Sequence, residues 1–316
     1  MFITINDCSD QVKALKDLVT IRRFDLMPKI IYARARLKCI RKQSQSDVSL
    51  ELCEQKMGWA RHVYTEHIKV LNGFMEKCHE TQRIYHTFAD GVCSEKVSIV
   101  DFLQAFDSLL LSLSAYGWDQ MNHPRIPVEF NKKHKDVLIM NGAHRVAAMY
   151  ALDPEGFVPT QLVPAGMEGE AYDEDYFRRR GLPPELLDSF AMQYVEIKTS
   201  IRALCLFPST DGRFAEQVNA LVSKFGKQVV RRDVWLNSVA QDLFVQHLYS
   251  GEEWIEEGSW MKTNACFANA SQPLTVIFVE SYVMPSDGSS ESENYLKELK
   301  QDLRRLFDKG MILGVI

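Results

Sequence analysis

The sequence contains few cysteines, and their spacing matches neither a disulfide framework nor a metal site. The seven cysteines are odd in number and widely spaced, and no two of them form a Cys-x-x-Cys pair. Small secreted domains use an even set of cysteines, and zinc ribbons use closely spaced pairs. The cysteine pattern therefore indicates a reducing compartment. The seven are Cys8, Cys39, Cys53, Cys78, Cys93, Cys205 and Cys266.

The chain also lacks a long apolar run and an excess of basic residues. No stretch approaches eighteen uninterrupted apolar residues, and no basic start precedes an apolar segment at the amino terminus. We therefore expect a soluble, cytoplasmic protein without a membrane partner. A formal net charge of −5 makes nucleic acid an unexpected partner, because affinity for a phosphate backbone comes from clustered lysine and arginine.

The common nucleotide-binding and hydrolase motifs are absent from the sequence. It contains no Gly-x4-Gly-Lys-[Ser/Thr], no Gly-x-Gly-x-x-Gly and no Gly-x-Ser-x-Gly. A P-loop kinase is thereby excluded. His62 and His67 are five residues apart, so they do not share a helix face as the two histidines of His-Glu-x-x-His do. A zinc site is not expected.

What the sequence does contain is a short apolar run followed by a glycine turn and a helix. Residues 137–140 predict a strand, and Gly142 can adopt a positive φ that brings the backbone close to a ligand. The first amides of the next helix have no internal partner and attract anions. Arg145 offers a bidentate fork, and His144 can donate a hydrogen bond or shuttle a proton. The pattern predicts an anion site; an ordinary strand-turn-helix junction with a surface arginine remains the alternative.

The elements before this turn extend the pattern. A helix is predicted over 99–115, a stop at Gly117, a short strand over 124–128 and a polar turn over 131–135. In this order, residues 99–152 resemble the ParB/sulfiredoxin superfamily, in which such elements lead to a D-G-H-H-R or G-G-C-H-R signature. The counterpart here is the 141–145 loop, Asn141-Gly142-Ala143-His144-Arg145. The resemblance implies a small sheet within residues 99–165.

The residues of the 141–145 loop distinguish between branches of that superfamily. Ala143 stands where sulfiredoxins carry a nucleophilic cysteine, so their repair chemistry is not expected. An acidic stretch over 168–175 follows, whereas partition proteins have a basic DNA-binding domain there. The closest analogy is with the small-molecule kinases, whose loop holds nucleotide phosphates. It implies ATP or another nucleotide with Mg²⁺, bound by all five loop residues, with His144 in a catalytic role. Asn141 replaces an aspartate, so the acid/base carboxylate must lie elsewhere.

Two regions offer that carboxylate. Glu76 lies near the end of a long predicted helix, on a stripe with Glu66, Lys69 and Asn72, and is our first choice; Asp107 and Asp119 are alternatives. The same stripe is also typical of a solvated helix face.

The second region follows the basic and acidic residues 231–233. Glu252 could serve as a base or Mg²⁺ ligand, and Lys262 could contact a phosphate. A solvated acidic turn with surface ion pairs is the alternative interpretation.

Together these patterns predict a mixed α+β or α/β protein in three parts. Residues 1–98 are expected to be mainly helical, with helices over 10–20, 27–42 and 48–78. Residues 99–165 form the ParB/sulfiredoxin-like unit. Alternating strands and helices over 195–316 predict an α/β layer with at least partly parallel strands.

The predicted function is a nucleotide-dependent phosphotransferase, a kinase that acts on a small hydroxylated metabolite. The alternative is a non-catalytic ParB-like regulatory protein that binds a nucleotide or nucleic acid. A basic surface over 34–42 would favour this alternative, although that run is also typical of a solvated helix face.

Overall fold

The computed structural model divides the chain into two compact units, Met1–Ile197 (unit 1) and Lys198–Ile316 (unit 2). The residues that the structure describes are 11–43, 50–80, 98–119, 123–131, 136–163, 171–198, 200–208, 215–250, 252, 255–268, 272–281, 297–299, 301–303, 305 and 313–315.

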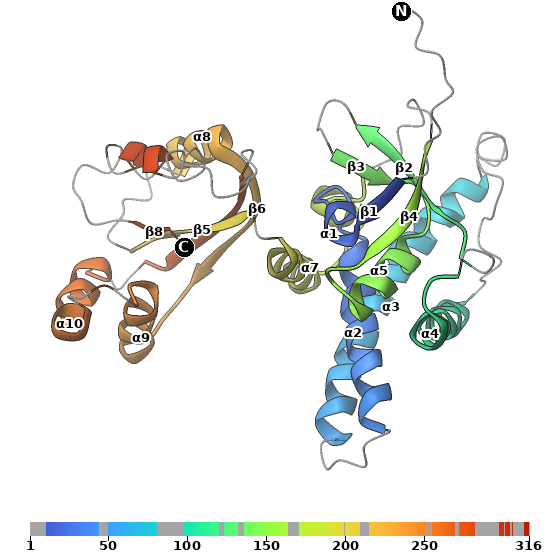
Figure 1. The fold of residues 1–316 in the computed structure, drawn as a ribbon. Coiled ribbons are helices and arrows are strands. Elements are labelled where there is room, and N and C mark those ends of the chain that lie inside the picture. Colours follow the sequence, from blue (N-terminus) through green and yellow to red (C-terminus); the bar gives the residue numbers. More distant parts are fainter. Residues whose placement is uncertain are drawn as a thin grey trace, which may run out of the picture. The chain divides into compact units, whose positions relative to one another are not determined.

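Unit 1 contains a mixed four-stranded sheet in the order β1-β4-β2-β3 (Figure 1). Strand β4 pairs with β1 in antiparallel and with β2 in parallel orientation, and β2 and β3 form an antiparallel hairpin. The hairpin was predicted, and it delivers the chain directly into the 141–145 loop. The strands are β1 (Gln11–Ala14), β2 (Ile126–Asn131), β3 (Asp136–Ile139) and β4 (Phe157–Leu162).

Helices surround this sheet and bury most of the core of unit 1. The helix α2 packs against both α3 and α5, and α7 packs against α2. The described helices are α1 (Leu15–Leu18), α2 (Leu26–Gln43), α3 (Leu50–Glu80), α4 (Ile99–Tyr116), α5 (Ala143–Leu152), α6 (Glu174–Arg179) and α7 (Pro184–Ile197). The predicted helices over 27–42, 48–78 and 99–115 are confirmed.

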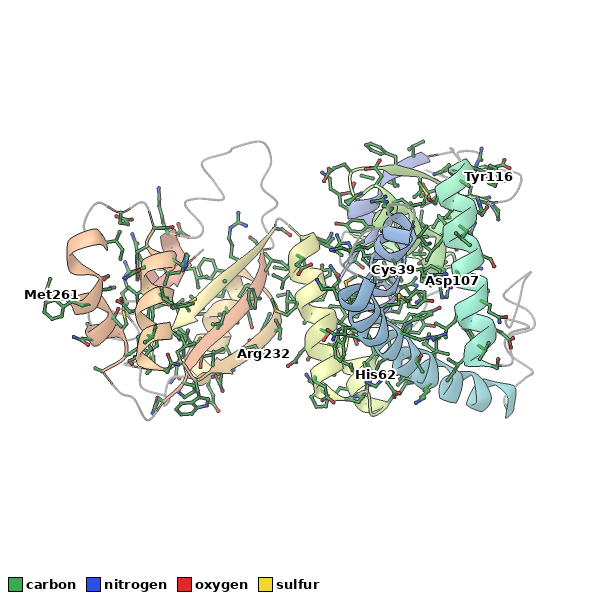
Figure 2. All side chains as sticks on the ribbon, turned by 90° about the horizontal axis from the view of Figure 1, so that it is seen from below. Cys39, His62, Asp107, Tyr116, Arg232 and Met261 are labelled. Atoms are coloured by element: carbon green, nitrogen blue, oxygen red, sulfur yellow. The ribbon has the colours of Figure 1, made fainter. Side chains whose placement is uncertain are left out.

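The ends of α4 show why this helix could be predicted well. Ser98 and Asp101 form a reciprocal capping box at its start, and Gly117 ends it with a φ of 68°. Within the described part of the chain, α4 alone is long and apolar enough to cross a membrane. Its Phe106 and Leu110 are nevertheless buried in unit 1, whereas Tyr116 at its end lies on the surface (Figure 2).

Unit 2 is a four-stranded sheet with helices on both faces (Figure 1). One face packs Leu204 and Ile277 against α8 and against Leu299 and Leu303. The other packs a second cluster, with side chains from α9 and α10. The elements are β5 (Ile201–Leu206), α8 (Ala215–Phe225), β6 (Gly226–Val234), α9 (Ser238–Leu248), α10 (Ile255–Cys266), β7 (Leu274–Ser281) and β8 (Leu313–Val315).

The prediction of parallel pairing in this region is wrong. All pairings described in unit 2, β5 with β7, β5 with β8 and β6 with β7, are antiparallel. Strands β5 and β6, which flank α8, do run in the same direction, as a strand-helix-strand unit requires. However, β7 lies between them and is antiparallel to both, so they never pair with each other.

The helix predicted over 10–20 is also wrong in its first half. Gln11–Ala14 form β1, whose register pairs Gln11 with Thr160 and Ala14 with Phe157, and only Leu15–Leu18 are helical. Pairing with β4 overrides the local helical periodicity, because a partner strand satisfies backbone groups that a single helical turn leaves open. The N-terminal region thus contributes a strand to the sheet that contains the β2–β3 hairpin.

Candidate functional site

The 141–145 loop forms a tight turn from β3 into α5. Asn141 Oδ1 accepts a hydrogen bond from the amide of Gly142 at 2.6 Å, and Gly142 caps the helix with a φ of 88°. The first internal hydrogen bond of α5 runs from the amide of Val146 to the carbonyl of Gly142. The amides of Ala143, His144 and Arg145 therefore precede the helical ladder, at the positive end of the helix dipole.

Arg145 braces this turn against the start of β2. Its guanidinium donates a hydrogen bond to the carbonyl of Pro124 and lies 5.9 Å from the ring centroid of Trp118. A Cβ atom on Gly142 would meet Arg145 Nη2 at 2.9 Å and Ile126 Cδ1 at 2.7 Å. The positive φ favours glycine at 142, and an added Cβ would also have to displace the ends of these two side chains. The guanidinium of Arg145, which was predicted to bind phosphate, therefore contacts a backbone carbonyl of the protein in this structure.

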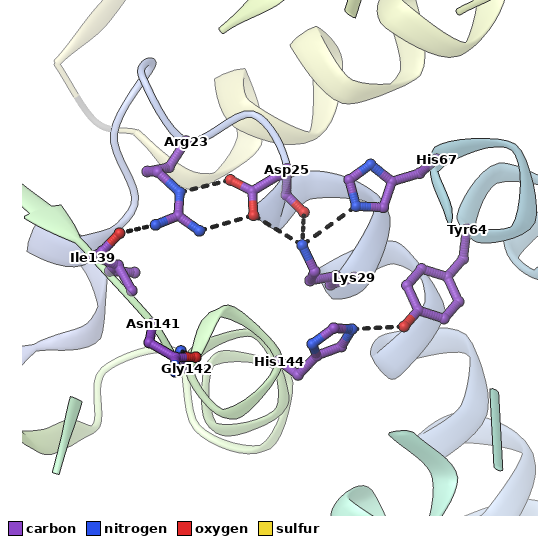
Figure 3. A network of polar contacts seen from close by, with 9 residues as sticks. All are labelled: Arg23, Asp25, Lys29, Tyr64, His67, Ile139, Asn141, Gly142 and His144. Carbon is purple, nitrogen blue, oxygen red and sulfur yellow. Dashed lines mark hydrogen bonds and ion pairs between the residues drawn. The ribbon is translucent and has the colours of Figure 1, made fainter. Parts of the chain in front are cut away.

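His144 is held by the two long helices α3 and α4. Its Nε2 lies 2.6 Å from the hydroxyl of Tyr64 on α3 (Figure 3). The ring of Phe106 on α4 meets the imidazole edge-on, with a centroid distance of 4.9 Å. Tyr64 is fully buried, and burial raises the pKa of its phenol, which therefore stays protonated. The imidazole orientation is thus fixed by one hydrogen bond and by aromatic packing.

A buried charged cluster lies beside these residues (Figure 3). Asp25 accepts hydrogen bonds from Arg23 at 2.7 and 2.9 Å and from Lys29 at 2.8 Å, and none of the three residues is more than 5% exposed. Although burial opposes it, the charges of Arg23 and Lys29 hold the pKa of Asp25 far below its usual range. Arg23 also donates to the carbonyl of Ile139, the last residue of β3. The cluster therefore anchors the strand that leads into the loop.

His67 extends the charged cluster toward Tyr64. Its Nε2 lies 3.3 Å from Lys29 Nζ, and its ring packs against the rings of Phe177 and Phe190. Burial first, and then the neighbouring Lys29, lower its pKa well below the usual value, so the ring is neutral. A neutral ring that accepts from Lys29 at Nε2 carries its proton on Nδ1. That atom is buried and has no hydrogen-bond partner among the described residues.

The carboxylates predicted as a base are placed as follows. Asp107 accepts a hydrogen bond from the hydroxyl of Tyr32 at 2.8 Å and one from Arg36 at 3.1 Å (Asp107 is labelled in Figure 2). Glu66 pairs with Lys69 at 2.6 Å on the outer face of α3. The side chain of Glu76 lies outside the described residues. Asp119 follows the end of α4 and is partly buried.

The remaining predicted residues lie in unit 2. Glu252 is exposed in the connection between α9 and α10. Lys262 on α10 places its ammonium 5.3 Å from the ring centroid of Tyr249. Asp233 accepts from Thr275 at 2.5 Å, and Arg231 lies 4.0 Å from it. The structure therefore brings the five loop residues together in unit 1, with Glu252 and Lys262 in the other unit.

Sequence reasoning missed the residues around His144. Arg23 and Asp25 lie just before α2, Lys29 lies in its first turn, and Tyr64 and His67 lie on α3. One signal was available: charged residues at 23, 25 and 29 interrupt a strongly apolar stretch, and 25 and 29 have the i, i+4 spacing of a helical ion pair. Among the described residues, no group of three or more acidic, histidine or cysteine side chains could hold a metal ion.

Comparisons with known proteins identify no relative of this chain. No protein-family model matches the chain, and neither the curated proteins nor the solved structures gave a significant match.

Proposed function

We propose that this protein is a nucleotide-dependent phosphotransferase that acts on a small hydroxylated metabolite and binds the nucleotide phosphates at the 141–145 loop. The observation that carries the proposal is the start of α5. There, the amides of Ala143, His144 and Arg145 precede the helical ladder, and the imidazole of His144 is fixed at the same helix end. Helix N-termini of this kind bind phosphate oxygens.

The charge beneath the loop supports an anionic ligand. Arg23 and Lys29 are buried with Asp25 as the one carboxylate that contacts them in the described network. When Lys29 is protonated the cluster carries one net positive charge, and a buried unbalanced charge is costly unless an opposite charge approaches. A phosphate at the 141–145 loop would supply that opposite charge. Phosphoryl transfer depends mainly on positioning and charge neutralisation, which this arrangement offers.

The order of elements from α4 to α5 supports a ParB/sulfiredoxin-like assignment of this region. A capped helix, Gly117, the β2–β3 hairpin, the loop and α5 follow one another as in the sequence pattern. On this proposal the protein is cytoplasmic, its cofactor is ATP or another nucleotide, and Mg²⁺ arrives with the nucleotide. Such an ion needs only one or two protein carboxylates.

The base that accepts the proton of the metabolite has to be a carboxylate outside the charged cluster. Asp25 is unsuited, because two cations hold both of its oxygens and keep it ionised. Glu76, on α3 of unit 1, remains the proposed candidate. The nucleic-acid alternative gains no support from the basic run, since Arg34 pairs with Glu196 and Arg36 with Asp107.

Calorimetric titration with ATP and Mg²⁺ tests the proposal directly. We expect the wild-type protein to bind, and ATP to be consumed in the presence of one member of a panel of hydroxylated metabolites. His144→Ala and Gly142→Ala should each weaken binding strongly. Gly181→Ala is the control, because Gly181 also has a positive φ of 78° but has no atom within 4 Å of an added Cβ. Failure of the wild-type protein to bind ATP or any other nucleoside triphosphate would overturn the proposal.

A further inference from the structure

The contact between His144 and Tyr64 fixes more than the position of the imidazole. The two side chains come from α5 and α3, and their polar atoms are 2.6 Å apart, Tyr64 hydroxyl to His144 Nε2. The imidazole also meets the rings of Tyr64 and Phe106 edge-on, with centroid distances of 6.0 and 4.9 Å. A ring flip that exchanged Nε2 for a carbon would lose the hydrogen bond to a fully buried hydroxyl, which is costly.

The burial of the Tyr64 hydroxyl decides the direction of this hydrogen bond. Burial raises the pKa of the phenol, and the nearby Tyr32 and Asp107 raise it further, so the hydroxyl keeps its proton. Among the described residues, His144 Nε2 is the hydrogen-bond partner of this fully buried hydroxyl, so a phenol that accepted from Nε2–H would leave its own proton without an acceptor, which is costly. The phenol therefore donates to an unprotonated Nε2. Neutral His144 that accepts at Nε2 must then carry its own proton on Nδ1, because each neutral ring has one donor and one acceptor nitrogen.

We infer that Tyr64 is a positioning residue that holds His144 as the Nδ1–H tautomer, so that His144 acts toward the ligand as a hydrogen-bond donor and not as a base. This inference rests on the proposed function for the identity of the ligand, a phosphate group at the 141–145 loop. A donor at this place complements phosphate oxygens, which only accept hydrogen bonds when ionised. The general base of the reaction is therefore a residue other than His144.

The tautomer of His144 can be measured without any ligand. In the ¹⁵N-labelled protein, long-range ¹H–¹⁵N correlation spectra distinguish protonated from unprotonated ring nitrogens. The signals of His144 are identified among those of the eight histidines because they are missing from the spectrum of His144→Ala. We expect an Nδ1–H ring in the wild type, and a shift toward the Nε2–H tautomer in Tyr64→Phe. An Nε2–H ring in the wild-type protein, or a spectrum that Tyr64→Phe leaves unchanged, would overturn the inference.

Tyr32→Phe is the matched control for this substitution. Tyr32 belongs to the same aromatic cluster, with its ring centroid 5.0 Å from that of Tyr64, and is equally buried. Its hydroxyl, however, donates to Asp107 and not to His144. Removal of this hydroxyl should leave the His144 tautomer as in the wild type. A change of tautomer in Tyr32→Phe as large as that in Tyr64→Phe would mean that general loosening of the cluster is responsible, and would overturn the inference.

Binding of ADP separates this inference from the proposed function. If the wild type binds ADP, Tyr64→Phe should weaken binding about tenfold, the effect of one misdirected hydrogen bond. In a His144→Ala background the same substitution should change the affinity less than about twofold, because its effect passes through His144. An equal loss in both backgrounds would overturn the positioning role. Absence of nucleotide binding by the wild type would overturn the proposed function, and the tautomer spectra would still decide the role of Tyr64.

Discussion

The two units are built from the same kinds of secondary structure, but they differ in the polar side chains that they bury. Each combines a four-stranded sheet with packed helices. Unit 1 nevertheless buries four ionisable side chains in one connected group, Arg23, Asp25, Lys29 and His67. Among the described residues of unit 2, the buried polar side chains are the hydroxyls of Ser200, Thr263 and Thr275.

This difference supports the placement of the proposed ligand site in unit 1. Buried ion pairs add little to stability relative to apolar residues of the same size, because desolvation offsets their attraction. Strongly shifted pKa values are also found more often at functional sites than elsewhere in proteins. Unit 1 has such a group directly beside the 141–145 loop, whereas the predicted residues Glu252 and Lys262 of unit 2 lie at or near the surface. The comparison favours unit 1 as the seat of the ligand site.

The largest expected effect comes from removing Asp25, the carboxylate that contacts both buried cations of the charged cluster in unit 1. Asp25→Asn leaves Arg23 and Lys29 without a counter-charge, and we expect the free energy of unfolding to fall by about 3–5 kcal/mol. Urea denaturation followed by circular dichroism measures this loss. The stabilisation is present above the pKa of an unfolded aspartate and is lost as pH falls toward the depressed folded pKa, so the gap between wild type and variant should narrow in acid.

The matched substitution in unit 2 is Asp242→Asn. Asp242 accepts hydrogen bonds from Thr263 at 3.0 Å and from Gln246 at 2.8 Å, and no cation is recorded among these contacts. An asparagine oxygen can still accept one of them, so we expect a loss of about 1 kcal/mol. Equal losses for Asp25→Asn and Asp242→Asn would remove the contrast between the two units.

The secondary structure of unit 1 could be predicted where local signals are strong. The apolar periodicity of 99–115, its stop at Gly117 and the glycine turn at 142 are local features, and each was confirmed. The strand β1 could not be found in this way, because its hydrogen bonds are made to β4, more than 140 residues later in the chain. The antiparallel insertion of β7 between β5 and β6 in unit 2 likewise depends on contacts between segments far apart in the sequence.

The candidate site could be predicted only in part, for a related reason. The five loop residues are contiguous, and so their pattern is visible in the sequence. The partners of His144 lie on other helices: Tyr64 comes from 80 residues earlier. Contact between such residues depends on how α3, α4 and α5 pack, which no local pattern records. The charged cluster was visible only as an anomaly, since Asp25 and Lys29 sit within an otherwise apolar stretch.

A smaller effect is expected from the buried histidine of unit 1. His67 remains neutral in the folded protein because its pKa is lowered well below the usual value. An unfolded histidine takes up a proton below about pH 6.5, so the free energy of unfolding falls as pH decreases from there, by at most about 1.4 kcal/mol per pH unit. In His67→Gln, which can still accept from Lys29, urea denaturation should show a shallower pH dependence. His247→Gln, at an exposed position of α9 in unit 2, should keep the wild-type dependence; if it flattened the curve as much as His67→Gln, burial in unit 1 would not be the cause.

The smallest effect is expected from the predicted phosphate residue of unit 2. Lys262 lies with its ammonium over the ring of Tyr249, a cation–π contact within unit 2 worth about 0.5–1 kcal/mol at a partly exposed position. Lys262→Ala should therefore lower the free energy of unfolding by about that amount and change the affinity for ATP less than about twofold. Calorimetric titration of Lys262→Ala and His144→Ala with ATP under the same conditions compares the two losses of affinity. A loss of affinity in Lys262→Ala as large as that in His144→Ala would make Lys262 part of the ligand site, as the sequence predicts. The two units would then differ in their buried side chains, but not in whether they contact the ligand.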